Sequence, residues 1–323
     1  MIKYIFKRIG LMIVSAFIIM TMLFVLIRLL PNPIQAVQGG MDAALREMRE
    51  AWGYNDPLMV QYGVFLKKVF TEFDWGFCTT MGTFLQPVTE FLASKLPPTI
   101  YVNVFSMLFS VPLGVLFGIL AAVFKNKWQD QVINVFIMVF ISVPSFVYAF
   151  LLQDIVGFKL GWCPLIFASG TDYFTWPMFH SAIMPILALS FGTIAGNMRL
   201  VRAELGETLT TDYMLLARTK GLTRRQAITR HALRNSMVPL MPSFLADVIY
   251  IISGSMIIEQ VFAIPGIGKT YVLAIGQRDY SVFMAISMFY VVIGLVAGLL
   301  FDLSYGFIDP RIRMGGGKTN ELS

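Results

Sequence analysis

The residues of this sequence that could do chemistry are concentrated in one charged segment, residues 199–235. Eight basic residues lie there against only three acids. The basic residues are Arg199, Arg202, Arg218, Lys220, Arg224, Arg225, Arg230 and Arg234, and the acids are Glu204, Glu207 and Asp212. Side chains of these types form ion pairs and helix caps. Such a segment suits docking to a partner better than it suits catalysis.

Outside this segment, groups that could bind a metal or a nucleotide are few. The two histidines, His180 and His231, are far apart and have no carboxylate neighbours, so we expect neither a metal site nor a catalytic site. Residues 266–270 resemble the end of a phosphate-binding loop, but Ala263 stands where that pattern requires glycine. We therefore expect no cofactor in this chain. Cys78 and Cys163 show no metal-binding spacing, and whether they pair stays open.

Two acidic residues lie in or beside apolar segments. Asp247 stands midway along a run long enough to cross a membrane, and Glu259 follows the end of that run. An ionisable group inside a membrane is costly, which makes it a functional candidate. Both acids are candidates for a translocation path. For Asp247 two explanations stay open: contact with a substrate ammonium, or a structural hydrogen bond to a neighbouring helix.

The apolar residues of the chain occur in long continuous runs. Hydrophobic residues make up 57% of the 323 residues, charged residues only 14%, and the mean hydropathy is +0.71. This composition excludes a soluble domain. Six runs reach the roughly 20 apolar residues that a membrane-spanning helix requires. They are residues 9–30, 99–124, 132–156, 179–198, 237–258 and 281–305, and we expect kinks, not helix ends, at Pro112, Pro144 and Pro185.

The basic residues also predict the orientation of the chain. With the N-terminus inside, sixteen basic residues fall on the cytoplasmic side and eight on the other. This bias places both termini in the cytoplasm, and it explains the net charge of +6 without a nucleic-acid partner. The sequence thus predicts an all-α, polytopic transmembrane bundle of about six spans in the lipid bilayer. Its parts are an N-terminal transmembrane helix (1–30), an extracytoplasmic excursion (31–98), a core with five transmembrane helices (99–305) that includes a cytoplasmic loop (199–236), and a cytoplasmic tail (306–323).

Local signals predict two short helices within that loop. Thr210 or Thr211 can cap a helix whose first turn carries Asp212, and Gly221 suits the left-handed position that ends it. Residues 223–226, Thr-Arg-Arg-Gln, form a capping box that starts a second helix reaching Arg234. The simpler alternative is a basic amphipathic helix resting on anionic headgroups. The capped corner favours a rigid lever that fits a groove in a partner.

The loop resembles the cytoplasmic "EAA" loop of ABC importer membrane subunits, in the form found in dipeptide/oligopeptide permeases. That form reads D-Y-x-x-x-A-R-x-K-G-L, then R-H-x-x-R-N and a proline. The matching residues are Asp212, Tyr213, Ala217, Arg218, Lys220, Gly221, Leu222, Arg230, His231, Arg234, Asn235 and Pro239. The glutamate and first alanine of the wider EAA pattern would fall on Leu215 and Leu216 and are absent.

Further matches extend the resemblance over nearly the whole chain. Residues 254–268, GSMIIEQVFAIPGIG, resemble the glycine, E-x-V-F and P-G-x-G pattern of the same permeases. Residues 302–313 resemble their D-x-x-Y-x-x-x-D-P-R-x-R terminus. Asp74-Trp75-Gly76 followed by Pro87-Val88 resembles their outer loop, although Cys78 stands where serine is usual.

The resemblance implies a type I ABC importer transmembrane domain in a bacterial or archaeal cell membrane. It implies a non-catalytic subunit that pairs with a homologous second permease. Two cytoplasmic ATPase subunits would bind ATP and Mg, and an extracytoplasmic binding protein would deliver dipeptides or oligopeptides. Glutathione, nickel complexes or another small solute are the alternative cargoes.

Within the loop, the resemblance implies a role for particular residues. Gly221 would permit the corner, Asp212, Arg218 and Lys220 would orient it, and Tyr213 with Leu216 would enter the ATPase groove. The alternatives from other classes are an ATP-independent channel or carrier and a membrane-embedded enzyme. A channel or carrier would require inverted repeats or several charges within the membrane, and an enzyme would require a cluster of catalytic side chains. The sequence shows neither.

Overall fold

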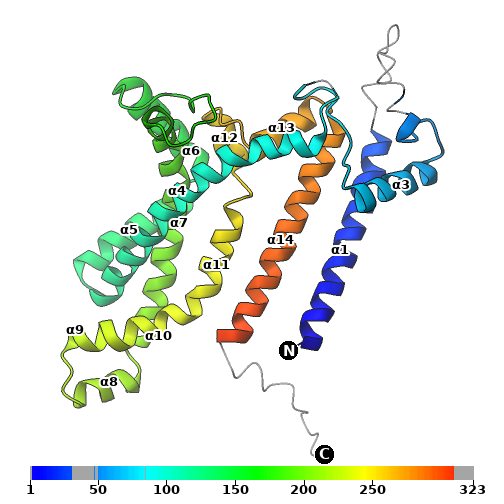
Figure 1. Cartoon of the computed structure of the whole chain (residues 1–323). Coiled ribbons are helices and arrows are strands. Elements are labelled where there is room, and N and C mark those ends of the chain that lie inside the picture. The colour runs from blue at the N-terminus through cyan, green and yellow to red at the C-terminus, as the bar shows by residue number, and fades with distance from the viewer. Residues whose placement is uncertain (1, 31–46, 48–49, 84, 309–323) are drawn as a thin grey trace, which may run out of the picture. The chain divides into compact units, whose positions relative to one another are not determined.

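The computed structural model describes residues 2–30, 47, 50–83 and 85–308, and these residues form helices joined by turns (Figure 1). An isolated bridge between Phe77 and Pro87 is the only β-type pairing in this part of the chain. The predicted all-α fold is confirmed. The chain divides into two compact units, one of residues 2–99 and 265–295, the other of residues 100–264 and 296–308. The expected terminal motif at residues 309–313 and the rest of the tail lie outside the described residues.

The first unit is built around helices α1 and α14. Its elements are α1 (Ile2–Leu29), α3 (Leu58–Lys67), the π-helical η2 (Lys68–Glu72), α13 (Ile267–Gly276) and the first parts of α4 (Val88–Val123) and α14 (Tyr280–Ile308). Phe24 of α1, Phe65 of α3 and Met284 of α14 belong to one buried apolar cluster. A second cluster joins Val88 of α4 to Ile286 of α14. Large side chains from four helices therefore form the core of this unit.

A buried carboxylate holds the loop before α4. Asp279, at the start of α14, is fully buried. One of its oxygens accepts hydrogen bonds from the backbone N–H groups of Thr79, Thr80 and Met81, at 2.8, 2.9 and 3.0 Å. Three charge-assisted hydrogen bonds offset the cost of burying the charge. The loop is thus fixed to the first turn of α14.

The second unit contains the charged segment. Its elements are the remainder of α4 and the end of α14, with α5 (Trp128–Ser142), α6 (Ser145–Leu152), η3 (Gln153–Lys159), α7 (Trp176–Thr208), α8 (Asp212–Thr219), α9 (Arg224–Ala227), η4 (Ile228–Ala232), α10 (Leu233–Met237), η5 (Val238–Leu240), α11 (Met241–Tyr250) and α12 (Met256–Val261). Met184 of α7 and Phe262, just after α12, are fully buried in its largest apolar cluster. Long apolar helices around one core are what a transmembrane bundle requires.

The expectation of a mere kink at Pro144 is wrong. Helix α5 ends at Ser142, and α6 with η3 continues at an angle of 97°. Val143 takes an extended backbone conformation (φ −91°, ψ 125°), as the residue before proline prefers. Pro112 and Pro185, by contrast, lie inside the unbroken helices α4 and α7.

The number of spans is not settled by helix length. Four helices of the described chain, α1, α4, α7 and α14, are long and apolar enough to cross a membrane, and the bent α5–α6 pair would make five. The expected span at 237–258 is not a single helix, because a turn at residues 251–253 and two further non-helical residues follow α11. Pro239 and Pro242 also remove backbone N–H donors near its start. Six spans with both termini in the cytoplasm therefore stay a prediction.

Two glycines allow α4 and α7 to pack closely. A Cβ atom added to Gly114 would lie 2.6 Å from Cβ of Asn197, and one added to Gly118 would lie 2.7 Å from Cβ of Val201. Carbon atoms do not approach this closely, so only glycine fits at either position. Small residues four apart are a common way to bring two membrane helices together.

We expect Gly118→Ala to destabilise the folded chain by about 1–3 kcal/mol, because the added methyl group overpacks the α4–α7 contact. Gly192→Ala is the matched control, since a Cβ at Gly192 of α7 meets nothing within 4 Å. Helix propensity alone predicts that the control gains up to about 1 kcal/mol. Thermal unfolding in detergent measures both variants. Equal stability of the two variants would contradict the close packing.

Candidate functional site

The charged segment begins where α7 ends. Helix α8 follows, and Thr211 takes the backbone conformation of an N-cap (φ −74°, ψ 152°). The predicted helix is therefore confirmed. Its side-chain cap is not formed, because the Thr211 hydroxyl donates instead to the carbonyl of Thr208 at 2.7 Å. Helix α7 extends to Thr208, so carbonyls without an intrahelical partner lie next to Thr211.

Gly221 ends α8 in the predicted left-handed conformation, with φ +87°. The N–H of Gly221 donates to the carbonyl of Arg218 (3.0 Å), and the N–H of Leu222 donates to that of Ala217 (3.4 Å). This pair of bonds is the Schellman motif, and Leu222 packs against the cluster that contains Ala217, as the motif favours. The corner is thus fixed by its own hydrogen bonds.

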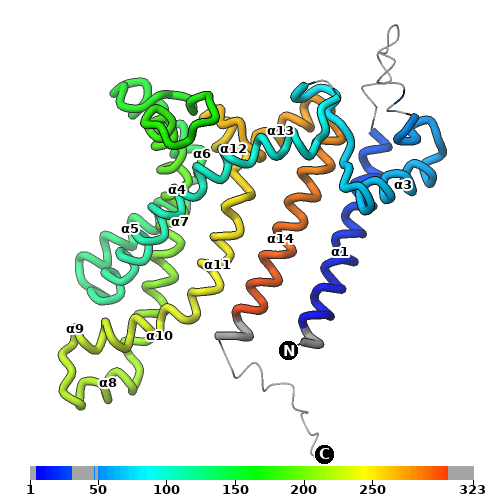
Figure 2. Tube along the Cα trace, in the orientation of Figure 1, coloured from blue at the N-terminus to red at the C-terminus, as the bar shows by residue number. Residues whose placement is uncertain are grey.

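The second helix begins with the predicted capping box. The N–H of Gln226 donates to the Thr223 hydroxyl at 3.3 Å, and the N–H of Thr223 donates to the Gln226 side chain at 3.0 Å. Helical structure then continues without a break through α9, η4, α10, η5 and α11 to Tyr250, so the second helix does not end at the expected Arg234. Figure 2 shows the chain leaving α7, turning through α8 and returning along α9 and α10. We call residues 212–237 the elbow.

A small apolar core makes the elbow rigid. Ala122 of α4 and Leu205 of α7 are buried together with four elbow residues. These four are Met214, Ala217, Ala227 and Ala232. Small and medium side chains at this spacing let the two elbow helices pack closely on each other and on the ends of α4 and α7. The elbow is therefore attached to both long helices.

The outward surface of the elbow is apolar at its first helix. Leu215 is 63% exposed and Leu216 is 56% exposed. Tyr213, which we expected beside Leu216 on the outward side, is half-buried and packs against the inner cluster instead. Two exposed leucines on one short helix are the type of apolar anchor that enters a groove in a partner protein.

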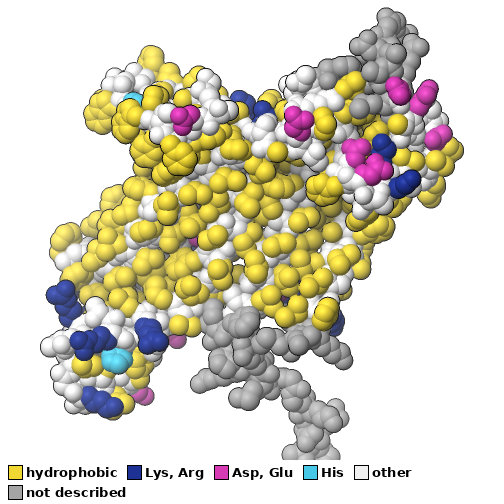
Figure 3. Space-filling model, in the orientation of Figure 1, with side chains coloured by type: hydrophobic (Ala, Val, Ile, Leu, Met, Phe, Trp, Pro, Cys, Tyr) yellow, Lys and Arg dark blue, Asp and Glu magenta, His cyan; other side chains and the backbone are white. Residues whose placement is uncertain are grey.

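Basic side chains surround this apolar pair. Figure 3 shows lysines and arginines gathered over the elbow. The other predicted docking residues with polar side chains are exposed, namely Asp212, Arg218, Lys220, Arg230, His231, Arg234 and Asn235. Within the described part of the chain, Asp212, Arg218 and Lys220 make no ion pair. We expected these three residues to orient the corner by ion pairs or caps; among the described residues they form no ion pair, and their side chains are exposed.

Arg224 attaches the elbow to α4 by a polar contact as well. Its guanidinium donates to the carbonyl of Val123, the last residue of α4, at 3.1 Å. Carbonyls at a helix C-terminus lack intrahelical partners and carry partial negative charge, which a guanidinium complements. The contact fixes the start of the second elbow helix to the end of α4.

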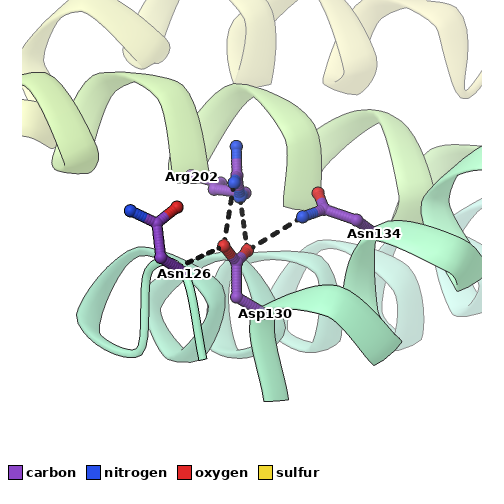
Figure 4. Close-up of polar contacts among 4 residues, drawn as sticks. All are labelled: Asn126, Asp130, Asn134 and Arg202. Carbon is purple, nitrogen blue, oxygen red and sulfur yellow. Dashed lines mark hydrogen bonds and ion pairs between the residues drawn. The ribbon is translucent and has the colours of Figure 1, made fainter. Parts of the chain in front are cut away.

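A buried ion pair attaches α7 to α5 near the elbow (Figure 4). Two nitrogens of Arg202 donate to the two oxygens of Asp130, at 2.6 and 2.9 Å. The backbone N–H of Asn126 and the amide of Asn134 also donate to Asp130, each at 3.0 Å. The Asp130 side chain is 3% exposed and that of Arg202 29%. A bidentate pair with two further donors is strong and directional.

Sequence reasoning missed this ion pair. Asp130 precedes the apolar run that starts at residue 132, and Arg202 counted as one more docking charge. Nothing local links two residues 72 positions apart. One weaker sequence signal is present: an acidic residue at the basic end of an apolar run is costly there, which indicates that it has a partner. Arg202 belongs to the bundle, not to the outward charges of the elbow.

The two acids expected in a translocation path have different surroundings. Asp247 of α11 is half-buried and lines a pocket of about 150 Å³. It makes no hydrogen bond or ion pair within the described chain, so the structural hydrogen bond that we considered is not formed. Glu259 of α12 is 3% exposed and does not line this pocket. The structure does not bring the two together.

Comparison with known proteins gives two family matches. Residues 114–314 match the profile of the binding-protein-dependent transport system inner membrane component, and residues 1–103 match the profile of the N-terminal part of such membrane components. The dipeptide transport system permease protein DppB of Lactococcus lactis subsp. cremoris is 35% identical over 97% of this chain and 100% of its own length. The glutathione transport system permease protein GsiC of Salmonella choleraesuis is 30% identical over 97% of this chain and 99% of its own.

A solved structure shares the fold. A chain of the MetNI methionine ABC transporter, solved in an inward-facing conformation, superposes with a TM-score of 0.51. The match covers 72% of this chain and 99% of that chain, at 18% sequence identity. At this identity the likeness concerns the fold alone, and it agrees with a helical membrane bundle.

Proposed function

Because the chain belongs to the family of binding-protein-dependent transport system inner membrane components, we propose that it is the permease subunit of an ATP-driven importer for short peptides. Family membership makes it a multi-pass inner-membrane protein. Its own role is to form the translocation pathway, and ATP hydrolysis belongs to separate subunits. The elbow is the observation that carries this assignment.

The elbow has the properties of a force-transmitting contact. Its first helix ends in a Schellman motif and its second begins with a capping box; it packs on α4 and α7 and presents an exposed apolar pair, Leu215 and Leu216, among basic side chains. A rigid segment of this kind converts the closing of a partner into tilting of the attached helices. The partners that this implies are two cytoplasmic ATPase subunits, which bind ATP and Mg. A homologous second permease and an extracytoplasmic binding protein complete the importer.

Peptides are the cargo that the similarities favour. The dipeptide permease relative is 35% identical and the glutathione permease relative 30% identical, each over nearly the full chain. Glutathione is itself a peptide with a free amino group, so it is the second candidate within the same chemistry. Of the two acids proposed for the path, Asp247 has the stronger case, since it lines a pocket while Glu259 is buried.

Purification and uptake test this proposal together. A tagged chain extracted in mild detergent should bring down an ATPase subunit, and proteoliposomes with the binding protein should take up a labelled dipeptide only when ATP is supplied. An ATP-independent carrier would take up the peptide without ATP and without an ATPase partner. Either of these two results contradicts the assignment.

A further inference from the structure

The pocket beside Asp247 is formed by three helices of the second unit. Ser106 and Ser110 belong to α4, Thr193 to α7 and Asp247 to α11. Its volume of about 150 Å³ exceeds what a bare ion needs, since one water molecule takes roughly 30 Å³ of liquid volume. It has room for a small polar group with a few attached carbon atoms. Tyr250, which also lines it, is 52% exposed, so the pocket can be reached from the surface of this chain.

Two hydroxyl groups that line the pocket, those of Ser106 and Thr193, lie in hydrogen bonds within the chain. Ser190 Oγ lies 2.6 Å from the carbonyl of Ile186 and 3.3 Å from that of Ser106, and donation to the nearer carbonyl leaves the proton of Ser106 for the 3.0 Å contact between the two hydroxyls. Thr193 donates to the carbonyl of Leu189 at 3.4 Å. A hydroxyl carries one proton and two lone pairs, so with these protons used the oxygens of Ser106 and Thr193 still have lone pairs that can accept. Both therefore present acceptor oxygens to the pocket.

Two groups of the pocket lack a partner among the described residues. Ser110 is fully buried, and its hydroxyl makes no hydrogen bond to any of them. Asp247 makes no hydrogen bond or ion pair within the described chain, and none of the residues that line the pocket is basic. Buried polar groups normally have partners, and a carboxylate within a membrane helix is costly without one. The pocket is thus rich in acceptors and negative, and it lacks a cationic donor.

From these contacts we infer that the pocket binds the α-ammonium group of a peptide cargo as it crosses the membrane. A primary ammonium has three N–H donors, no acceptor and one positive charge. These donors match the Asp247 carboxylate and the hydroxyl oxygens around it. The inference rests on the proposed function and adds to it a named recognition contact: the permease itself, and not only the binding protein, selects for a free amino terminus.

The test uses the complete importer in proteoliposomes with two cargoes. They are alanyl-alanine and lactyl-alanine, in which a hydroxyl group replaces the amino group. Uptake rates are compared at equal occupancy of the binding protein, so that its own preference does not enter. Because a charge-assisted hydrogen bond is lost, Asp247→Asn should lower uptake of alanyl-alanine by about tenfold or more and of lactyl-alanine by less than about twofold.

Further variants separate charge from structure. Asp247→Glu keeps the carboxylate and should restore most of the preference for the amine. Ser110→Ala removes one acceptor and should lower only alanyl-alanine uptake, by about threefold. The matched control is Asp154→Asn, since Asp154 is exposed and already paired with Lys159 at 2.6 Å. It should leave both rates unchanged.

Three results would overturn the inference. The first is an equal loss for both cargoes in Asp247→Asn, as a purely structural role would produce. The second is an unchanged preference for the amine. The third is a loss of wild-type uptake when choline replaces sodium ions, which would assign the pocket to an alkali cation. If the wild type moves neither cargo, the proposed function fails and the inference fails with it. If the wild type moves both cargoes and Asp247→Asn keeps the preference for the amine, only the inference fails.

Discussion

Gly221→Pro should abolish ATP-driven peptide uptake, with a loss of about a hundredfold or more, while the chain still inserts into the membrane. Proline fixes φ near −65°, whereas residue 221 requires +87°, and it removes the N–H that donates to Arg218. The mismatch costs about 3 kcal/mol or more at the residue that sets the angle between the two elbow helices. Both helices of the elbow would then lose their mutual angle, and Leu215 and Leu216 would leave their docking position.

Gly221→Ala is the control for this prediction. A Cβ at residue 221 meets nothing within 4 Å, so alanine introduces backbone strain of about 1–2 kcal/mol without a steric clash and keeps the N–H. We expect partial uptake from this variant. Membrane insertion and ATPase binding are measured by fractionation and copurification. Normal uptake by Gly221→Pro would show that the corner does not transmit force.

The second large effect is expected at the ion pair between α5 and α7. Asp130→Ala leaves Arg202 without its partner, and breaking a buried pair from one side typically costs 3–5 kcal/mol. Arg202 is 29% exposed, so the lower end, about 3 kcal/mol, applies. Because α7 leads directly into the elbow, we also expect uptake to fall by about tenfold or more while the ATPase still binds.

A double-mutant cycle isolates this contact. Removing both partners in Asp130→Ala/Arg202→Ala should cost clearly less than the sum of the two single changes, because the two residues interact. Arg199→Ala is the matched control, since Arg199 lies on the same helix, is exposed and makes no ion pair with any residue that the structure describes. Thermal unfolding in detergent and uptake provide the two readouts. Additive effects of the two single changes would show that Asp130 and Arg202 do not interact.

The elbow could be predicted from sequence because its signals are local. The capping box at Thr223 and the left-handed Gly221 each depend on residues within six positions of one another, and both are confirmed. Pro144 shows the opposite case. It has the same local preference as Pro185, yet only Pro144 breaks its helix. Pro185 is buried in the core of the second unit, whereas Pro144 is exposed, so tertiary packing decides the difference.

The contacts between helices could not be predicted in the same way. Residues far apart in sequence meet in the Asp130–Arg202 pair and in the pocket beside Asp247. No local sequence pattern links them. Gly114 and Gly118 are the exception. Their spacing of four within an apolar run is a known packing signal, and it marks where α4 meets α7. Such spacing identifies the surface of one helix that makes a close contact, but only the structure shows which helix packs against it.

Labelling of a cysteine in the elbow tests the central claim most directly. The variant Leu216→Cys places a thiol at a position that is 56% exposed. Cys163, which is partly buried, is replaced by serine. Cys78 can remain, because it is fully buried and burial raises the pKa of its thiol to about 12, which keeps it unreactive.

A membrane-impermeant maleimide is then added to intact cells and to inside-out vesicles. If the elbow docks an ATPase on the cytoplasmic face, residue 216 is unlabelled in cells, labelled in vesicles stripped of the ATPase subunits, and protected when those subunits are restored. Labelling of residue 216 in intact cells would contradict the whole account.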